Sequence, residues 1–374
     1  MKVPHTTDLN LSTRILLGPG PSMIAPRVLK ALATPVVGHL DPEFLEVMSE
    51  VQDLLRYTFQ TENDFTIPIS GTGSAGMEAA LCNFLEPGDR ALVAINGYFG
   101  ERLAEMATRY QAHVDRLERP WGEIFSPEEI ESALQRGDYK ILALVHGETS
   151  TGAVQRDIAA ITAAAHRSGA LVVLDTVASL GGTPVEVDAW DVDICYSGSQ
   201  KGLSAPPGLA PLTVNQRALD VLNNRSSPVA NWYLDLTLLG RYWGEPHAYH
   251  HTAPVNMICA LREALRLAAE EGLEARFSRH RANAELLWDG LENLGLPPLI
   301  PEQNRLVTLT TPQLPTGLDE LNLRRRLLAE YNIEIAGGFG PLAGKIWRIG
   351  LMGFSSRREN VALLLAVLND FLKA

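Results

Sequence analysis

The sequence predicts an α/β fold in which helices cover both faces of a mostly parallel sheet. Short apolar runs, most of them bounded by Gly, Pro or Asp, recur through the middle of the chain at 91–95, 141–146, 171–175, 193–198 and 209–214. Helical patterns such as DIAAITAAAHRSG separate most of them. Continuous apolar strands that alternate with helices are typical of a parallel sheet that is buried on both faces.

The segments before and after this rhythm are of a different kind. The segment EFLEVMSEVQDLLRYTF (43–59) has the i, i+3, i+4 spacing of an amphipathic helix, whereas RILLGPGPSMIAP (14–26) is rich in turn residues. From about residue 255 a long helical stretch (256–295) leads to the short apolar runs LVTLTT, IEIAGG and IWRIG and to a terminal helix from Arg357. This order predicts a smaller α+β unit, joined through the helix rather than through a flexible linker.

The composition limits the class of protein. The 374 residues exceed one compact core of ordinary size, so we expect two domains or one large α/β domain with a smaller one. Hydrophobic residues make up 46% and charged residues 20%, as in ordinary soluble globular proteins. The net charge of −12 argues against a nucleic-acid partner, which would favour a basic surface.

Cysteine usage and the chain ends favour a cytosolic enzyme. Cys82, Cys195 and Cys259 lie far apart without metal-ligand spacing, which fits a reducing compartment and no disulfide framework. The start of the sequence lacks the apolar core of a secretory signal, its end is not a clear peroxisomal tripeptide, and no apolar run is long enough to span a bilayer. We therefore expect a cytoplasmic protein without a membrane partner.

Ligands of open α/β sheets gather at the carboxyl ends of the strands, and polar clusters lie at the corresponding places in this sequence. The first cluster, SGTGSAGMEAALCNFL (70–85), is a Gly/Ser/Thr loop that opens into a helix. Its unpaired backbone N–H groups and the hydroxyls of Thr72 and Ser74 suit a phosphate. The loop matches no nucleotide-specific motif, and a plain N-cap and turn explain it equally well when it is read alone.

Two further clusters follow neighbouring runs. The segment HGETSTG (146–152) can position a ring substituent or a substrate carboxylate, or can simply form a turn. Asp175 ends the run at 171–175, where a buried carboxylate is costly unless it has a cationic partner; capping a neighbouring helix is the alternative.

Lys201 follows the next run, in YSGSQKGLSAPPG (196–208), a stretch of small, polar and turn-forming residues. It is either a solvated loop lysine or a lysine held in a pocket, where a shifted pKa makes its amine a nucleophile. The spacing allows Asp175 and Lys201 to converge on one cleft. An acidic residue, an isolated lysine and a phosphate-ready helix end are together the groups that pyridoxal phosphate requires.

These motifs resemble those of the class V aminotransferases of pyridoxal-phosphate-dependent fold type I, close to the alanine–glyoxylate and serine–glyoxylate (serine–pyruvate) aminotransferases. The resemblance covers nearly the whole chain, through LLGPGPSMIAP, SGTGSAGMEAAL, LEPGD, NGYFGER, HGETSTG, DTVASLGG, YSGSQKGLSAPPG, YHHTAP, IEIAGGFGP and KIWRIGLMG. It implies a large α/β domain with a mostly parallel sheet sandwiched by helices, and a smaller C-terminal α+β domain. The implied bounds are 1–20 for an N-terminal arm at the dimer and active-site interface, 21–260 for the large cofactor-binding domain and 261–374 for the small domain.

The same resemblance implies roles for individual residues. Lys201 is then the Schiff-base lysine, and Asp175 pairs with the pyridine nitrogen. The other implied cofactor contacts are Thr72, Gly73 and Ser74 along the phosphate, Val177 on the ring face, Thr149 near the phenolic oxygen and Gln200 beside the lysine. Phe99 takes the stacking position over the ring, where several relatives carry a tryptophan, and Ser74 takes a position filled by histidine in some relatives.

The segment YHHTAP (249–254) bears on assembly. The resemblance implies that Tyr249 and Thr252 reach the phosphate of the other subunit, so that a homodimer shares its active sites. A metal site is the competing interpretation, but adjacent histidines rarely point at one ion and no Asp, Glu or Cys stands at a supporting spacing, so we expect no metal. Four other polar residues near the motifs are expected to be structural or interface groups rather than catalysts: His39, Glu148, His250 and His251.

Arg348 lies between Trp347 and Ile349 on a short apolar run. Such an arginine is either paired internally or aimed into a cleft, where its planar fork binds a carboxylate through two parallel hydrogen bonds. The resemblance makes Arg348 the residue that binds the substrate α-carboxylate.

For the reaction, the resemblance implies transamination of a small amino acid, alanine or serine, with glyoxylate to give glycine and a 2-oxo acid. A ureidoglycine–glyoxylate transaminase shares most of these motifs and is the alternative. A cysteine desulfurase is a poor match, because its reactive cysteine would lie on a mobile loop and all three cysteines fall in predicted helices or a strand. A phosphoserine or aminoethylphosphonate transaminase would want a basic cluster that is not obvious, and a cofactor-free scaffold would be signalled by loss of the lysine or the aspartate.

Overall fold

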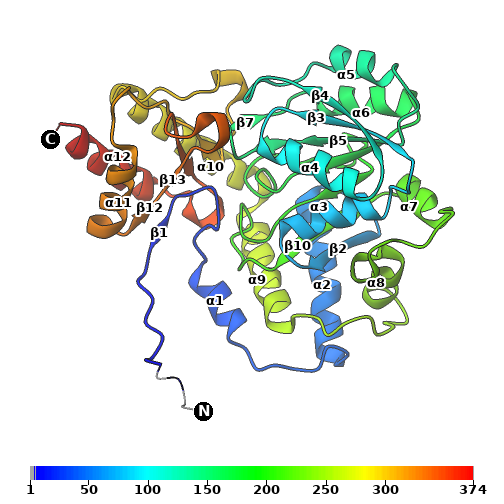
Figure 1. Ribbon diagram of the computed structural model, residues 1–374. Helices are drawn as coiled ribbons and strands as arrows, with labels where there is room; N and C mark the ends of the chain where they lie inside the picture. The colour runs from blue at the N-terminus through cyan, green and yellow to red at the C-terminus, as the bar shows by residue number, and fades with distance from the viewer. Residues whose placement is uncertain (1–3, 5, 374) are drawn as a thin grey trace.

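The computed structural model of the protein describes residue 4 and residues 6–373. Its centre is a seven-stranded sheet with the strand order β2-β10-β9-β8-β5-β3-β4 (Figure 1). The strands are β2 (Phe65–Ser70), β3 (Arg90–Ile95), β4 (His113–Glu118), β5 (Ile141–Val145), β8 (Leu171–Asp175), β9 (Ile194–Tyr196) and β10 (Leu209–Val214). Only β10 runs against its neighbours, being antiparallel to both β2 and β9. The prediction of a mostly parallel sheet is therefore confirmed.

The strands are apolar for a physical reason. Every residue of β5, β8, β9 and β10 is buried, which requires cover on both faces of the sheet. The helices around the sheet are α2 (Pro42–Phe59), α3 (Gly73–Cys82), α4 (Tyr98–Arg109), α5 (Pro127–Leu134), α6 (Ile158–Arg167), α7 (Gln216–Asn223), α8 (Leu236–Trp243) and α9 (Val255–Glu271). These helices and strands form one large hydrophobic cluster.

Helix α2 illustrates how the local sequence sets an element. Asp41 caps the helix by accepting a hydrogen bond from the N–H of Glu43, and Pro42 occupies the first turn. The helix buries an apolar stripe of Phe44, Met48, Val51, Leu55 and Phe59 and ends at Gln60 in a left-handed conformation. The predicted amphipathic helix is confirmed.

The C-terminal part of the chain packs beside the sheet (Figure 1). It contains α10 (Leu273–Asn293), β11 (Leu309–Thr310), α11 (Glu320–Tyr331), β12 (Ile333–Glu334), β13 (Ala336–Gly337), β14 (Trp347–Gly350) and α12 (Arg358–Lys373). The predicted helical stretch 256–295 is two helices rather than one, because Gly272 adopts a positive φ of 80° between α9 and α10. A second hydrophobic cluster, which includes Trp347 and Leu364, holds this part together.

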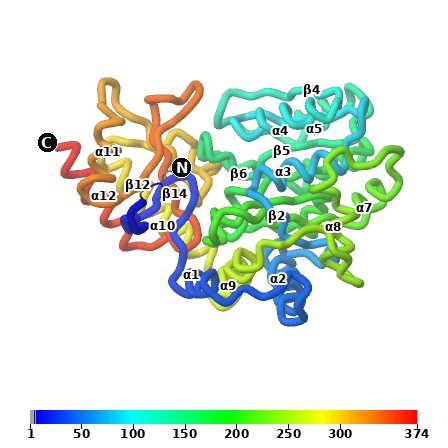
Figure 2. Tube along the Cα trace, turned by 60° about the horizontal axis from the view of Figure 1, so that its bottom comes forward, coloured from blue at the N-terminus to red at the C-terminus, as the bar shows by residue number. Residues whose placement is uncertain are grey.

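The N-terminal segment joins this C-terminal part rather than the central sheet. Strand β1 (Ile15–Leu16) pairs in parallel with β12, and Leu17 belongs to the second hydrophobic cluster. Figure 2 shows the segment passing beside β12 and β14 before it enters α1 (Pro26–Leu32). The turn-rich stretch that follows β1 is therefore carried across to the carboxyl ends of the sheet.

One smaller element lies beside the sheet. A hairpin of β6 (Gly147–Glu148) and β7 (Ala153–Val154) follows β5 directly. No helix in residues 4 and 6–373 combines the length and the hydropathy that a bilayer-spanning segment requires.

Candidate active site

The site forms where β8 and β9 end. Asp175 is the last residue of β8 and is only 2% exposed, and Tyr196 lies directly opposite it in register on β9. The Tyr196 hydroxyl donates to Asp175 Oδ2 at 2.7 Å, and the backbone N–H of Val177 donates to Oδ1 at 2.8 Å. Burial raises the pKa of Asp175 to about 6 against the opposing effect of the Tyr196 hydrogen bond. Asp175 therefore accepts hydrogen bonds locally and caps no helix.

Lys201 lies in the turn that follows β9, and its side chain is largely withdrawn from solvent. Burial lowers the pKa of Lys201 to about 8, while the charge of Asp175 acts in the opposite direction. The ammonium donates a hydrogen bond to the carbonyl oxygen of Pro19. Lys201 is thus a largely buried lysine and not a solvated loop lysine, and its charge interacts with that of Asp175. The region around these two residues is called the cleft below.

The turn-rich N-terminal segment holds the lysine in place. The Ser22 hydroxyl donates to the carbonyl oxygen of Lys201 at 2.8 Å, and the Ser22 N–H donates to that of Gln200 at 2.9 Å. Gly20 has a φ of 106°, and a Cβ atom there would lie 2.6 Å from Lys201 Cδ. The positive φ favours glycine at this position, and a larger residue would also displace the end of the Lys201 side chain. The sequence analysis did not foresee this contact, because it joins segments that lie far apart in the chain.

The Gly/Ser/Thr loop opens into α3 as predicted. Thr72 stands at the N-cap position but makes no side-chain capping hydrogen bond, so the loop does not satisfy its own helix end in the usual way. A Cβ atom at Gly73 would lie 3.2 Å from Val177 Cγ2 and 3.7 Å from Gly198 Cα. The start of α3 therefore meets the residues that follow β8 and β9.

Phe99 is held at the start of α4 by a buried carboxylate. Glu148 is 1% exposed, and its Oε2 accepts the N–H of Phe99 at 3.0 Å, while its Oε1 accepts the N–H and the hydroxyl of Ser150. Burial raises the pKa of Glu148, and the Ser150 hydrogen bonds oppose that shift. Thr149 is buried in the same hairpin. The expectation of a structural role for Glu148 agrees with these contacts, which bind the Phe99 backbone directly.

Arg348 lies on β14, in the C-terminal part of the chain. Its Nε donates to the carbonyl oxygen of Gly337 at 2.8 Å, and its guanidinium lies 4.4 Å from the centre of the Phe339 ring. No carboxylate lies within ion-pair distance of Arg348 in the described residues, and burial lowers its pKa to about 10. Arg348 is therefore not part of an internal ion pair.

A row of aromatic rings connects Arg348 with the cleft. The Phe339 ring packs edge to face on Tyr98 at 4.9 Å, and Tyr98 packs edge to face on Phe99 at 5.6 Å. The rings of Phe339 and Tyr98 therefore form a continuous row of contacts between Arg348, which is predicted to bind the substrate, and Phe99, which is predicted to stack on the cofactor. Phe339 and Tyr98 were not singled out from the sequence, although both lie inside the quoted motifs.

Tyr249 and Thr252 do not join this group. Tyr249 is 63% exposed with its ring 5.2 Å from that of His39, and Thr252 is also exposed. The Nδ1 atoms of His250 and His251 lie 2.9 Å apart, and His251 Nε2 is 2.7 Å from the Ser70 hydroxyl. Within residues 4 and 6–373, no group of three or more His, Cys, Asp or Glu side chains is arranged to hold a metal ion.

The residues of the cleft fit pyridoxal phosphate. Gln200 Oε1 is a buried polar atom without a hydrogen-bond partner in the described part of the chain, and it lies next to Lys201. The cleft also offers a buried carboxyl for a ring nitrogen, an amine of lowered pKa and the uncapped start of α3 for a phosphate. Each group that the cofactor needs is present within one set of neighbouring segments.

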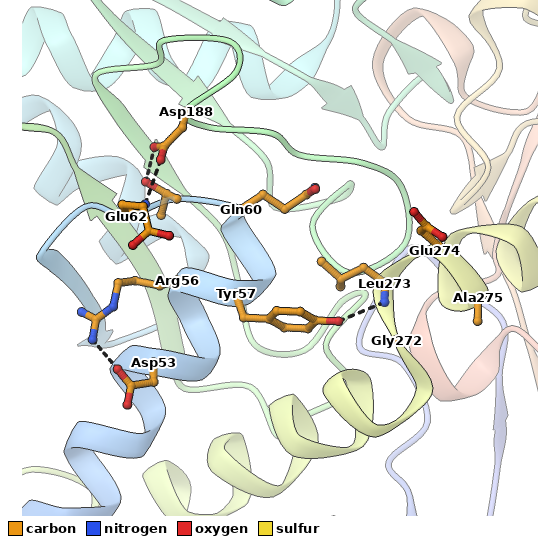
Figure 3. Close-up of a pocket in the computed structure, with 11 residues that line it drawn as sticks. Asp53, Arg56, Tyr57, Gln60, Glu62, Asp188, Gly272, Leu273, Glu274 and Ala275 are labelled. Atoms are coloured by element: carbon orange, nitrogen blue, oxygen red, sulfur yellow. Dashed lines mark hydrogen bonds and ion pairs between the residues drawn. The ribbon is translucent and has the colours of Figure 1, made fainter.

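A hollow of about 900 Å³ lies away from these residues, between the end of α2 and the junction of α9 with α10 (Figure 3). Some of its polar groups bind one another: Arg56 pairs with Asp53, and the Tyr57 hydroxyl accepts the N–H of Leu273 at 3.3 Å. None of the predicted site residues lines it.

Comparison with known proteins identifies the family. The model of the family described as aminotransferase class-V matches residues 16–350. The chain is 44% identical to the (S)-ureidoglycine–glyoxylate transaminase of Bacillus subtilis (strain 168), over 98% of this chain and 92% of that protein. It is 40% identical to the alanine–glyoxylate aminotransferase of Drosophila melanogaster, over 98% of this chain and 94% of that protein. A solved structure of alanine–glyoxylate aminotransferase from Nostoc sp. superposes with a TM-score of 0.97 at 52% identity, covering 99% of this chain and 98% of that one. The chain belongs to the class V aminotransferases, with the fold of the pyridoxal-phosphate-dependent enzymes of type I.

Proposed function

We propose that the protein transfers the amino group of a small amino acid, alanine or serine, to glyoxylate, giving glycine and the corresponding 2-oxo acid. Class V aminotransferases depend on pyridoxal phosphate, which is the cofactor of this protein. The observation that carries the proposal is the cleft itself, where the charges of Lys201 and Asp175 interact and Arg348 has no carboxylate partner among the described residues. A small neutral amino acid supplies the carboxylate for Arg348 and needs no second basic cluster.

Several residues would hold the cofactor. Asp175 would bind the pyridine nitrogen and Lys201 would bind the aldehyde carbon. The remaining contacts would come from Thr72, Gly73 and Ser74 at the phosphate, Val177 and Phe99 on the two ring faces, Thr149 at the phenolic oxygen and Gln200 beside the lysine. When bound, the cofactor supplies an electron-withdrawing ring that stabilises negative charge at the substrate α-carbon.

The chemistry of the chain itself follows from charge placement. The fork of Arg348 binds the α-carboxylate and fixes the orientation of the substrate. Lys201, whose pKa lies near 8, is partly unprotonated at neutral to mildly alkaline pH, so its amine can take the α-proton and return it. The two hydrogen bonds to Asp175 keep that carboxyl oriented toward the ring position.

Ureidoglycine is a second candidate for the amino donor. The Bacillus subtilis relative, at 44% identity, carries the name (S)-ureidoglycine–glyoxylate transaminase, while the Drosophila melanogaster relative is an alanine–glyoxylate aminotransferase at 40%. The two identities are too similar to choose a donor. Selectivity between small side chains amounts to only about 1–3 kcal/mol per methylene in a pocket.

A panel of half-reactions tests the proposal. The purified protein loaded with pyridoxal phosphate is mixed separately with alanine, serine, ureidoglycine and phosphoserine, and loss of the visible absorbance of the lysine-bound cofactor is followed. We expect rapid loss with alanine or serine and recovery on addition of glyoxylate. A response to ureidoglycine alone would move the protein to that activity, and no visible absorbance after added pyridoxal phosphate would contradict the assignment of Lys201.

We further propose a homodimer with shared active sites. The exposed positions of Tyr249 and Thr252 support this, since both are free to contact a second copy. Residues 1–20 would form an arm at that interface, 21–260 the cofactor-binding domain and 261–374 the small domain. Sedimentation of the purified protein tests the assembly, and a monomer that retains full activity would contradict shared sites.

A further inference from the structure

Arg102 is a cation of the cleft to which neither the sequence analysis nor the proposed reaction gives a role. It lies on α4 one turn after Phe99, so both side chains lie on the same side of the helix. Its Nη1 donates to the Ser74 hydroxyl at 3.0 Å, in the first turn of α3. Arg102 therefore reaches the end of the cleft where the phosphate of the cofactor is expected.

The charge of Arg102 is not neutralised within the chain. Its guanidinium lies 5.0 Å from the centres of both the Tyr98 and the Phe99 rings, and no carboxylate lies within ion-pair distance in the described residues. Arg109, on the same helix, instead pairs with Glu105 at 2.5 Å. The aromatic faces hold the planar guanidinium in one orientation without consuming its hydrogen-bond donors.

Arg102 also acts electrostatically on the reactive groups. Burial raises the pKa of Asp175 and lowers that of Lys201, and the positive charge of Arg102 opposes the first shift and adds to the second. A cation close enough to affect both groups belongs to the cleft and not to the outer surface of α4.

The charges of the cleft leave open which cation neutralises the phosphate of the cofactor. The phosphate of the cofactor carries about two negative charges at neutral pH, and the start of α3 offers N–H groups and a dipole that compensate only part of them. Lys201 and Arg348 are already engaged with the aldehyde and the substrate carboxylate. Among the described residues, Arg102 is the cation that contacts the start of α3.

We propose that Arg102 binds the phosphate of the cofactor, together with Ser74 and the first turn of α3. This inference rests on the proposed function and extends it by one binding residue. The guanidinium turns from the Ser74 hydroxyl, or shares it, to donate to phosphate oxygens. Because the same side chain packs on Phe99, phosphate binding also fixes the ring that lies over the cofactor. The alternative is a purely structural tie between α3 and α4.

The test compares two ligands that differ only in the phosphate. Apoprotein of the wild type, Arg102→Met, Arg102→Lys and the control Arg109→Met is titrated with pyridoxal phosphate and with pyridoxal, and binding is followed by the visible absorbance of the lysine-bound ligand. We expect Arg102→Met to raise the Kd of pyridoxal phosphate by about 10- to 100-fold, as the loss of a charge-assisted hydrogen bond predicts, and to leave that of pyridoxal within about threefold. Arg102→Lys keeps the charge without the planar fork, so its Kd for pyridoxal phosphate should rise by about three- to tenfold while its Kd for pyridoxal stays unchanged.

A second measurement does not involve the lysine. Inorganic phosphate should raise the Tm of the wild-type apoprotein and of Arg109→Met, and should raise that of Arg102→Met much less. If the Arg102 variants lose equal affinity for pyridoxal phosphate and for pyridoxal, the inference is overturned in favour of a structural tie. Unchanged affinity for both ligands would overturn it as well. If Arg102→Met does not fold, the same selectivity is read from Arg102→Lys. Failure of the wild type to bind pyridoxal phosphate would instead contradict the proposed function, so the two failures are distinguishable.

Discussion

The cleft at the ends of β8 and β9 differs from the hollow in Figure 3 mainly in how its charges are paired. In the hollow, Arg56 pairs with Asp53 and Asp188 accepts the N–H of Glu62 at 2.8 Å (Figure 3). In the cleft, Arg348 has no carboxylate partner among the described residues, and burial shifts the pKa values of Lys201 and Asp175 toward neutrality.

This difference indicates which property favours the cleft as the candidate functional site. The hollow is large, but its Arg56 is paired with Asp53, and its carboxylates without a partner in the described residues, Glu62 and Glu274, are exposed to water. The charges of the cleft are only partly compensated by neighbouring carboxylates such as Glu148, and a ligand of matching charge can complete the compensation. Unpaired charge in a protected position, and not the size of a hollow, therefore separates the two regions.

The largest expected effect comes from removing the amine of the cleft. We expect Lys201→Ala to reduce transamination on the order of 10⁴-fold, because the same amine binds the cofactor and moves the α-proton. The matched change in the hollow, Arg56→Ala, should leave the rate within about twofold. Steady-state assays with alanine and glyoxylate measure both, and a Lys201→Ala enzyme with a tenth of the wild-type rate would refute the assignment.

Next in size is the loss of the unpaired guanidinium. Arg348→Met should raise the KM for the amino donor by about 100-fold, since two charge-assisted hydrogen bonds to the carboxylate disappear. The KM of Arg348→Lys should lie between those of the wild type and Arg348→Met, because an ammonium keeps the charge but does not reproduce the planar fork. Arg326→Met, which removes an exposed arginine paired with Glu330, is the control and should leave KM unchanged. A KM that stays constant in Arg348→Met would mean that the carboxylate binds elsewhere.

A smaller effect concerns stability. The pKa of Asp175 is raised from 3.8 to about 6, so the folded state binds the proton more tightly than the unfolded chain. The wild-type apoprotein should therefore lose stability as pH rises from about 4 to about 6, by at most roughly 3 kcal/mol. Asp175→Asn cannot ionise and should be more stable than the wild-type apoprotein at pH 8 by about 1–2 kcal/mol, while binding the cofactor less well.

Urea unfolding of the two apoproteins at pH 4 and pH 8 checks this expectation. The difference should be small at pH 4, where the wild-type carboxyl is largely protonated. Asp53→Asn in the hollow should show no comparable gain. An Asp175→Asn apoprotein that is less stable at pH 8 would mean that the ionised carboxylate is stabilising in its site.

The smallest effect is a pH dependence of cofactor uptake. With its pKa lowered to about 8, Lys201 should bind the cofactor aldehyde about tenfold faster at pH 8.5 than at pH 7 and change little above pH 9, because the free amine is the reactive form. Stopped-flow absorbance of apoprotein mixed with pyridoxal phosphate measures the rate. A rate that keeps rising steeply through pH 10 would indicate an amine of ordinary pKa.

The sequence was most informative about the positions of strands that are buried along their whole length. The runs that became β5, β8 and β10 are apolar along their whole length, so their positions could be predicted closely. Strand β4 was missed because it is a half-exposed edge strand with the polar sequence HVDRLE. The break at Gly272 was also missed, since the apolar periodicity continues across the glycine and only the backbone conformation reveals the turn.

For the site, the sequence predicted which side chains would carry the chemistry and not what holds them. Asp175 and Lys201 stood out because each follows an apolar run, which the structure confirms. The contact of Tyr196 with Asp175 depends on the register of β8 with β9, and that of Gly20 with Lys201 depends on the path of the N-terminal segment. Neither register nor path can be derived from periodicity.

By itself, the sequence determined the fold class, the order of most of the buried strands and the family, because burial on both faces forces continuous apolar strands and the motifs are local. Only the tertiary structure decided which charges are paired and which are not. The ionisation of Lys201 and the free fork of Arg348 depend on neighbours brought together from distant parts of the chain, since desolvation and Coulomb interactions act through space and not along the sequence.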